Sequence, residues 1–209
     1  MTEYFKSQVH DEINAIVGPM ASLLGQRLAY LAMMVPDGGQ IVEIGSLRGK
    51  SSCFMGAAIK EDEGKVKLHC VDLWDIGGQK RVHSGKEVRL TFTANINRFG
   101  LQDIIEPHMA ESVAFSRKWH GSIDLLFIDG SHAYKDCLAD YQAWHKFLKP
   151  GGWIAFHDYQ KECPGVMRVI DETVTPGGLF ENIQITREYE LTQPGKPGQV
   201  LWTAQRKTK

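Results

Sequence analysis

Residues 41–52 read IVEIGSLRGKSS, and the rest of the chain is organised around this stretch. Residues 41–44 are mostly apolar and predict a short strand, and the serines that close the stretch predict the start of a helix, because hydroxyl groups cap free N–H groups. Gly45 follows the strand at a point where a side chain would block the approach of a ligand to the backbone. A strand, a glycine loop and a helix in this order predict a nucleotide-binding corner.

Three kinds of nucleotide-binding site occur at such a corner, and the spacing of their glycine residues distinguishes them. A phosphate-binding loop needs four residues between its first glycine and the Gly-Lys-Ser, whereas three separate Gly45 from Gly49. A dinucleotide fingerprint needs Gly-x-Gly-x-x-Gly, which is absent. A nucleoside cofactor without a phosphate chain needs neither pattern, and Glu43 supplies an acid near the strand end. We favour the nucleoside; an ordinary strand-to-helix turn and a nicotinamide-dependent oxidoreductase stay open.

Composition narrows the class of protein further. The chain has 209 residues, 43% of them hydrophobic, which favours one domain with a substantial core. Its net charge of -1 gives no electrostatic case for a nucleic-acid or anionic-membrane partner. The four cysteines form no C-x-x-C pair and predict reduced thiols. Because we find neither a signal-peptide pattern nor an apolar run long enough to cross a membrane, we expect a cytoplasmic protein.

The periodicity of apolar residues predicts an α/β fold. Helical spacing covers residues 3–16 and a second helix with Pro19 in its first turn. Five strands then alternate with helices, the fifth following a sharp turn at residues 148–152, and two further strands joined through residues 194–198 form a hairpin. Alternation of this kind predicts a doubly wound, mostly parallel seven-stranded sheet that ends in an antiparallel hairpin. We assign residues 1–37 to an N-terminal helical cap and residues 38–209 to the cofactor-binding domain. The predicted strands are residues 41–44, 66–74, 104–109, 123–129, 153–156, 180–192 and 199–205.

Acidic residues and histidines follow several of these strands. Ligands of doubly wound folds gather at the carboxyl ends of the strands, so these side chains should meet. Asp72 ends the second strand, where a carboxylate can accept both hydroxyls of a ribose. Glu111 follows the third strand within reach of an adenine, and Ser112 is expected to cap the next helix. The polar, basic loop at residues 76–86 is expected to be either a lid or a plain solvated loop.

With these residues in view, residues 38–205 resemble the class I S-adenosylmethionine-dependent methyltransferases. More narrowly, FIDGSHAY at residues 127–134 and LKPGGWIAFHD at residues 148–158 resemble the group related to macrolide-sugar O-methyltransferases and cephalosporin-hydroxylase-like proteins. The resemblance implies S-adenosylmethionine as methyl donor, with its methionine part at Glu43, Gly45 and Gly49. The full set of predicted cofactor-binding residues is Glu43, Gly45, Ser46, Gly49, Ser51, Asp72, Leu73, Trp74, Glu111, Ser112 and Asp129.

The resemblance also bears on a metal. Some members of the group bind magnesium through an acid that matches Asp129 and an acidic pair that matches His157 and Asp158. Here His157 replaces a carboxylate, and histidine is a poor ligand for magnesium but suits manganese, iron or zinc. The predicted metal ligands are therefore Asp129, His157 and Asp158, and metal dependence is left open.

A hydroxyl acceptor must lose its proton during methyl transfer, which requires a base. His132 is the first candidate because imidazole titrates near neutral pH; His157 is the second, and Asp129 would orient His132 or the cofactor. We expect a small-molecule acceptor and no nucleic-acid or membrane partner, and we leave a homo-oligomer open. A metal-dependent hydroxylase-like or non-catalytic protein on the same scaffold remains the alternative.

Overall fold

The computed structural model describes residues 7–74, 85–188 and 198–208 of the chain. The expected lid at residues 76–86 falls almost entirely outside the described residues, apart from the two residues that begin a helix. Most of the expected connection between the last two strands, and the first residues of the expected N-terminal helix, also lie outside them.

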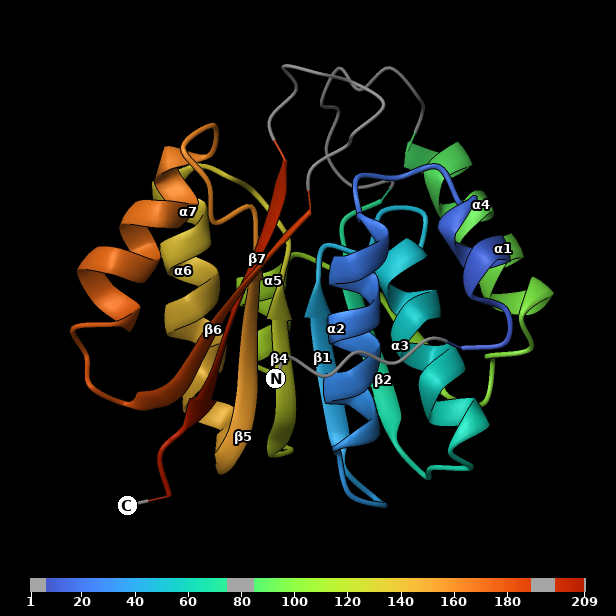
Figure 1. Cartoon of the computed structure of the whole chain (residues 1–209), viewed down its shortest axis with the longest axis horizontal. Helices are drawn as coiled ribbons and strands as arrows, with labels where there is room; N and C mark the ends of the chain where they lie inside the picture. The colour runs from blue at the N-terminus through green and yellow to red at the C-terminus, as the bar shows by residue number, and fades with distance from the viewer. Residues whose placement is uncertain (1–6, 75–84, 189–197, 209) are drawn as a thin grey trace.

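A seven-stranded sheet forms the centre of the molecule, in the order β3-β2-β1-β4-β5-β7-β6 (Figure 1). The first five strands are parallel, and β7 runs antiparallel to both β5 and β6. This confirms the predicted fold class. The strands are β1 (Gln40–Ile44), β2 (Lys67–Asp72), β3 (Ile105–Met109), β4 (Ile123–Ile128), β5 (Leu148–His157), β6 (Phe180–Glu188) and β7 (Gln199–Arg206).

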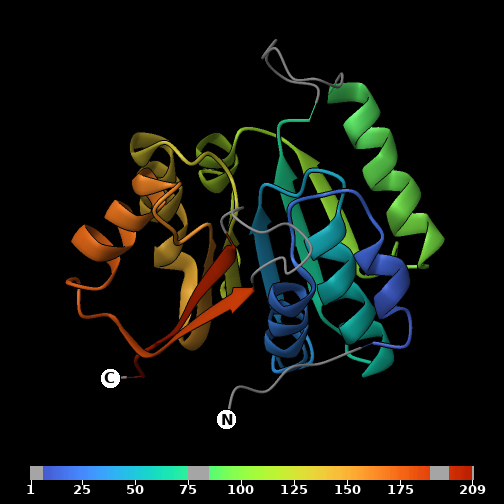
Figure 2. The same cartoon turned by 45° about the horizontal axis from the view of Figure 1, so that its top comes forward.

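Helices cover both faces of this sheet, each over its own hydrophobic core. Figure 2 shows the blue-to-green helices on one side and the yellow-to-orange ones on the other. The first group is α1 (His10–Asn14), α2 (Ser22–Met33), α3 (Lys50–Glu61) and α4 (Gly85–Arg98). The second is α5 (Ser112–Ser116), α6 (Tyr134–Trp144) with a 3-10 turn (His145–Phe147), and α7 (Pro164–Val169) with a π-helical turn (Ile170–Val174).

Strand β1 pairs with β2 on one side and with β4 on the other, so the chain reverses its direction of winding at β1. All six residues of β4 are buried, which explains its continuous apolar sequence. A crevice forms beyond the carboxyl ends of the strands at such a reversal, and ligands of open α/β sheets bind there. Within the described residues, no helix combines the length and the apolar character needed to cross a membrane.

Three local predictions were wrong. The second helix begins at Ser22 because Ala21 is extended, with ψ of 151°, and Pro19 lies outside the helix. Strand β5 begins at Leu148, where we expected a turn; Leu148 pairs with Ile123, and the positive φ of 80° at Gly151 accompanies a shift in register. The cap of α5 is the side chain of Glu111 rather than Ser112.

Candidate active site

A cavity of about 720 Å³ lies at the carboxyl ends of β1, β2, β3 and β4. It brings together most of the residues that the sequence singled out from separate strands. The predicted residues that line it are Gly45, Ser46, Ser51, Asp72, Leu73, Glu111, Ser112, Asp129, His132 and Asp158. The predicted residues Glu43, Gly49, Trp74 and His157 are not among the described residues that line it.

Glu43 lies behind the cavity wall. Its side chain is fully buried, and its carboxylate accepts hydrogen bonds from the hydroxyls of Ser46 (2.9 Å), Ser51 and Ser52 and from the thiol of Cys70 (3.1 Å). Burial raises the pKa of this carboxyl, against the lowering effect of these donors. Glu43 therefore joins β1, β2 and the start of α3. We had expected it to contact the methionine part of the cofactor, but it is buried and is not among the described residues that line the cavity.

Asp72 holds the loop that follows β1. Its Oδ2 accepts the backbone N–H groups of Ser46 and Leu47, both at 2.9 Å, and its Oδ1 accepts that of Trp74 at 2.8 Å. In a phosphate-binding loop such N–H groups would face a phosphate. Because a carboxylate already binds two of them, this corner suits a ligand without a phosphate chain. Asp72 also lines the cavity, where its oxygens have lone pairs left for sugar hydroxyls.

Backbone conformation and close packing require glycine at both Gly45 and Gly49. Gly45 has φ of 85°, and a Cβ there would lie 2.2 Å from the carbonyl oxygen of Asp129. Gly49 is the N-cap of α3 in the left-handed conformation, with φ of 80°, and faces Phe92. We had assigned both glycines to ligand contact. Gly45 lines the cavity and also makes room for the neighbouring strand end, whereas Gly49 is not among the described residues that line the cavity.

Trp74 packs inside the protein. It is buried, its ring lies 4.8 Å from that of Phe92, and its Nε1–H donates to the carbonyl of Leu47 at 2.8 Å. Asn95 of α4 donates to the next carbonyl, that of Arg48, at 2.8 Å. Trp74 therefore supports the loop from behind, together with α4.

The wall beyond β3 contains an acid that we had not predicted. Asp140 on α6 is buried, lines the cavity, and hydrogen-bonds to Ser112; burial raises its pKa to about 6. Ser112 in turn accepts from Trp144 Nε1 at 2.8 Å. Asp140 lies three residues after Cys137 and four before Trp144, so the helical spacing of buried residues was a signal that could have found it.

The segment between α1 and α2 also lines the cavity, at Val17, Gly18, Pro19 and Met20. From the sequence we had assigned Pro19 to the first turn of a helix. Val17 is 73% exposed at the cavity, so this segment gives the site an apolar rim.

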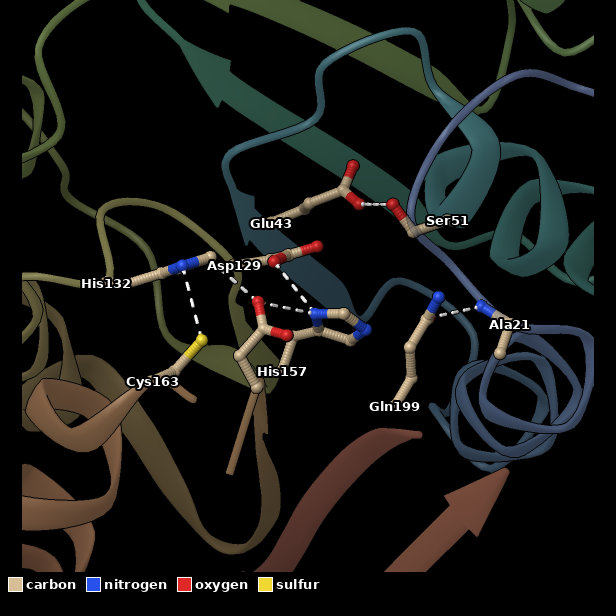
Figure 3. A network of polar contacts seen from close by, with 9 residues as sticks. Ala21, Glu43, Ser51, Asp129, His132, His157, Cys163 and Gln199 are labelled. Atoms are coloured by element: carbon tan, nitrogen blue, oxygen red, sulfur yellow. Dashed lines mark hydrogen bonds and ion pairs between the residues drawn. The ribbon is translucent and has the colours of Figure 1, made fainter. Parts of the chain in front are cut away.

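The second cluster of the site centres on Asp158, which has φ of 60°. Its Oδ2 lies 2.8 Å from His132 Nε2 and 2.9 Å from His157 Nδ1. His157 Nδ1 also lies 3.4 Å from Asp129 Oδ1, and His132 Nδ1 lies 3.4 Å from the Sγ of Cys163 (Figure 3). The structure thus connects all four residues that we had predicted for catalysis and metal binding.

The charges of this cluster are coupled. Burial would lower the pKa of His157, but the charges and hydrogen bonds of Asp129 and Asp158 outweigh burial and raise that pKa to about 10. The hydrogen bond to Asp158 likewise raises the pKa of His132. Burial would raise the pKa of Asp158, yet its two histidine partners hold it well below the usual range, whereas burial raises the pKa of Asp129. These pKa shifts favour the charged form of His157 between the carboxyl groups of Asp129 and Asp158.

Two overlapping sets of side chains in this cluster could coordinate a metal ion. Asp129, His157 and Asp158 form one set, and His132, Asp158 and Cys163 form the other; within each set the ligand atoms lie within 4.8 Å of one another. Both sets contain nitrogen or sulfur, which favours manganese, iron or zinc over magnesium.

Comparison with known proteins agrees with the fold. The chain is 29% identical over 140 residues to an uncharacterized protein of Acanthamoeba polyphaga mimivirus, covering 64% of this chain and 58% of the relative. It is 28% identical over 120 residues to an uncharacterized protein of Sinorhizobium fredii, covering 57% of this chain and 13% of the relative. An O-methyltransferase from Bacillus cereus, solved in complex with SAH, superimposes with a TM-score of 0.69 at 16% identity, over 95% of this chain and 88% of that one.

The sheet order is that of the Rossmann-like class, and the cavity lies at the β1 corner, where ligands of open α/β sheets bind. The family model described as "Methyltransferase domain" matches residues 42–159, which is more than half of the chain. The chain belongs to this family. It spans 58% of the length of the first relative and 13% of the second.

Proposed function

We propose that this protein transfers a methyl group from S-adenosylmethionine to a hydroxyl of a small molecule. One observation carries the proposal: a single cavity joins the acid of a sugar-binding corner, Asp72, to a cluster that can move a proton, His132 with Asp158. The motifs at residues 127–134 and 148–158 support a place in the group related to macrolide-sugar O-methyltransferases and cephalosporin-hydroxylase-like proteins.

The residues around the cavity fit this donor. Asp72 faces the cavity for the ribose, and the wall formed by Glu111, Ser112 and Asp140 offers acceptors for an amino group of adenine. Asp129 and Ser51 lie nearer the sheet centre, where they suit the ammonium and carboxylate of a methionine group. S-adenosylmethionine supplies, when bound, a methyl group on a positively charged sulfur.

His132 would act on the acceptor. Its Nε2 faces Asp158 at 2.8 Å, so Nδ1, which lies 3.4 Å from Cys163 Sγ, is the atom that can accept the proton of a hydroxyl. Displacement at the methyl group depends on alignment and on exclusion of water, and the apolar rim at Val17–Met20 supports both. The acceptor is then a small molecule with an apolar part.

A divalent metal fits the same cluster. Asp129, His157 and Asp158 would hold it, and its charge would lower the pKa of a bound hydroxyl. The same set of metal ligands would suit a hydroxylase-like protein, which is the alternative function.

The first test is calorimetric titration with S-adenosylmethionine before and after treatment with a chelator. Micromolar binding supports the donor, and a loss of binding on chelation places a metal beside it. Binding of NAD in place of S-adenosylmethionine would overturn the proposal. Iron in the purified protein together with oxygen-dependent turnover would favour the hydroxylase-like alternative. If S-adenosylmethionine binds, mass spectrometry of reactions with small hydroxyl compounds identifies the methyl acceptor.

We expect the substitution Asp72→Asn to weaken S-adenosylmethionine binding by about 10- to 100-fold, since a hydrogen bond to a charged group contributes about 1.5–3 kcal/mol. The change also weakens the contacts that hold Ser46 and Leu47. Calorimetry measures the effect. Asp103→Asn, at an exposed carboxylate outside the cavity, is the matched control. Equal affinity for both variants would remove Asp72 from the binding site.

We expect His132→Gln to lower kcat by about 10²- to 10⁴-fold while KM for the donor changes little. In the wild-type protein, kcat should rise with pH through a value above that of an ordinary histidine, because the base works when neutral and Asp158 raises its pKa. Initial rates against pH measure both effects. The exposed His120, replaced by glutamine, is the control, and unchanged turnover of His132→Gln would exclude it as the base.

A further inference from the structure

A second group of metal-ligating side chains lies apart from the cavity. His69 is on β2, and Glu106 and His108 are on the neighbouring edge strand β3. In the register of the two strands His69 pairs with Glu106, and Val71 pairs with His108. The three side chains share the sheet face that α5 covers, since His69 and His108 contact Trp119 and Phe115 there. They are not among the described residues that line the cavity.

The donor atoms of this group converge. His69 Nδ1 lies 3.0 Å from His108 Nε2. Glu106 Oε2 lies 3.7 Å from His69 Nδ1, and Glu106 Oε1 lies 3.8 Å from His108 Nε2. Around a tetrahedral zinc ion, ligands at about 2.0–2.1 Å from the metal lie roughly 3.3 Å from one another. One ligand atom from each residue lies within 4.8 Å of the other two, so small movements of the exposed glutamate would bring the three atoms to the separations that such an ion requires.

The two imidazole rings are held in place by their neighbours. The ring of His69 stacks on that of His108 at 5.2 Å and meets Trp119 edge-on at 4.8 Å, and His108 lies 4.5 Å from Phe115. The histidine side chains are only 12% and 17% exposed, whereas Glu106 is 57% exposed, so the group opens to solvent on the glutamate side. Burial lowers the pKa of both histidines, which favours the neutral form that coordinates metals.

We propose that His69, Glu106 and His108 bind a zinc ion, with water at the fourth position. Two imidazoles and one carboxylate are a donor set of borderline softness, which zinc prefers and magnesium or calcium does not. The ion joins β3 to β2 close to the ends from which Asp72 and Glu111 reach the cavity. It therefore stabilises this edge of the sheet, whatever reaction the cavity supports.

The test is calorimetric titration of metal-free protein with zinc chloride, supported by thermal unfolding. We expect the wild-type protein to bind one equivalent of zinc at this site. His108→Gln should lose this equivalent, and Glu106→Gln should bind it at least tenfold more weakly. His120→Gln, at an exposed histidine outside the group, retains it. At zinc concentrations about 100 times Kd, Tm of the wild type and of this control rises by about 5–10 °C more than Tm of His108→Gln.

Comparison of the wild type with the three variants distinguishes this site from the cluster around Asp158. Zinc bound at the Asp158 cluster is the same in all four proteins, so it does not contribute to the differences between them. Glu106→Gln changes an exposed side chain, so it folds even if a histidine variant does not. Equal zinc stoichiometry and affinity in wild type and Glu106→Gln would overturn the proposal, as would no zinc uptake by the wild type. In crystals grown with zinc, an anomalous peak between the three side chains is expected.

Discussion

Replacing Gly45 with alanine is expected to destabilise the protein by about 2–5 kcal/mol and to remove donor binding. The positive φ of 85° costs an L-residue about 1–2 kcal/mol, and forcing extra volume into a packed site costs about 1–3 kcal/mol more. A Cβ would lie 2.2 Å from the carbonyl oxygen of Asp129 and 2.7 Å from its carbonyl carbon. Both are backbone atoms, so β1 and β4 must separate where Asp129 enters the cavity. Urea unfolding and calorimetry with S-adenosylmethionine measure the two effects.

Gly38→Ala provides the matched control. Gly38 also has a positive φ, 77°, but among the described residues no atom lies within 4 Å of an added Cβ. This variant therefore carries the backbone cost alone, about 1–2 kcal/mol, and keeps normal donor binding. If both variants lose the same stability, the close approach to Asp129 contributes nothing and the account of Gly45 is wrong.

The architecture could be predicted because it depends on patterns that are local in sequence. A buried strand such as 123–128 is apolar throughout, and the helices between strands have the period of a helix. Once the strands are parallel, residues that end them must meet, so Asp72, Asp129 and Asp158 could be brought to one cavity from sequence alone.

The inward or outward direction of a side chain at a strand end could not be predicted in the same way. Glu43 precedes the loop just as a ligand-binding acid would, yet it is buried among Ser51, Ser52 and Cys70. Only the packing of α3 against β1 and β2 decides this, and that packing joins residues far apart in sequence. Likewise, no local pattern marks Val17–Met20 as cavity wall, because their position depends on how α1 and α2 sit over the sheet.

The other large effect is expected at Asp158. The substitution Asp158→Asn should destabilise the protein by about 3–5 kcal/mol, the usual result of removing one partner of a buried ion pair. Asp158 Oδ2 lies 2.9 Å from His157 Nδ1 and 2.8 Å from His132 Nε2. Without its charge, the acidic partner that remains for His157 among the described residues is Asp129, at 3.4 Å. Urea unfolding at pH 6 measures the loss.

The pH dependence of stability distinguishes this explanation from a simple packing defect. The pKa of His157 is raised from 6.5 to about 10, so its contribution is complete below pH 6.5 and is lost as the pH rises towards 10. The pKa of Asp158 is lowered, so its contribution is present above the ordinary value of 3.8 and is lost as the pH falls below it. Wild-type stability should therefore decline on both sides of this window, and Asp158→Asn should flatten both declines.

An exposed ion pair of similar length supplies the control. Glu12 lies 2.7 Å from Arg98, and both side chains are more than half exposed, so Glu12→Gln should cost less than about 1 kcal/mol. If Asp158→Asn costs no more than this, burial does not strengthen the contacts of Asp158. If its stability still declines between pH 7 and 10 as steeply as that of the wild type, then the charge of His157 does not depend on Asp158, and Asp129 alone must hold it. The two ion pairs differ in burial more than in length. Water screens the exposed pair of Glu12 and Arg98, whereas it is excluded from the buried contacts of Asp158.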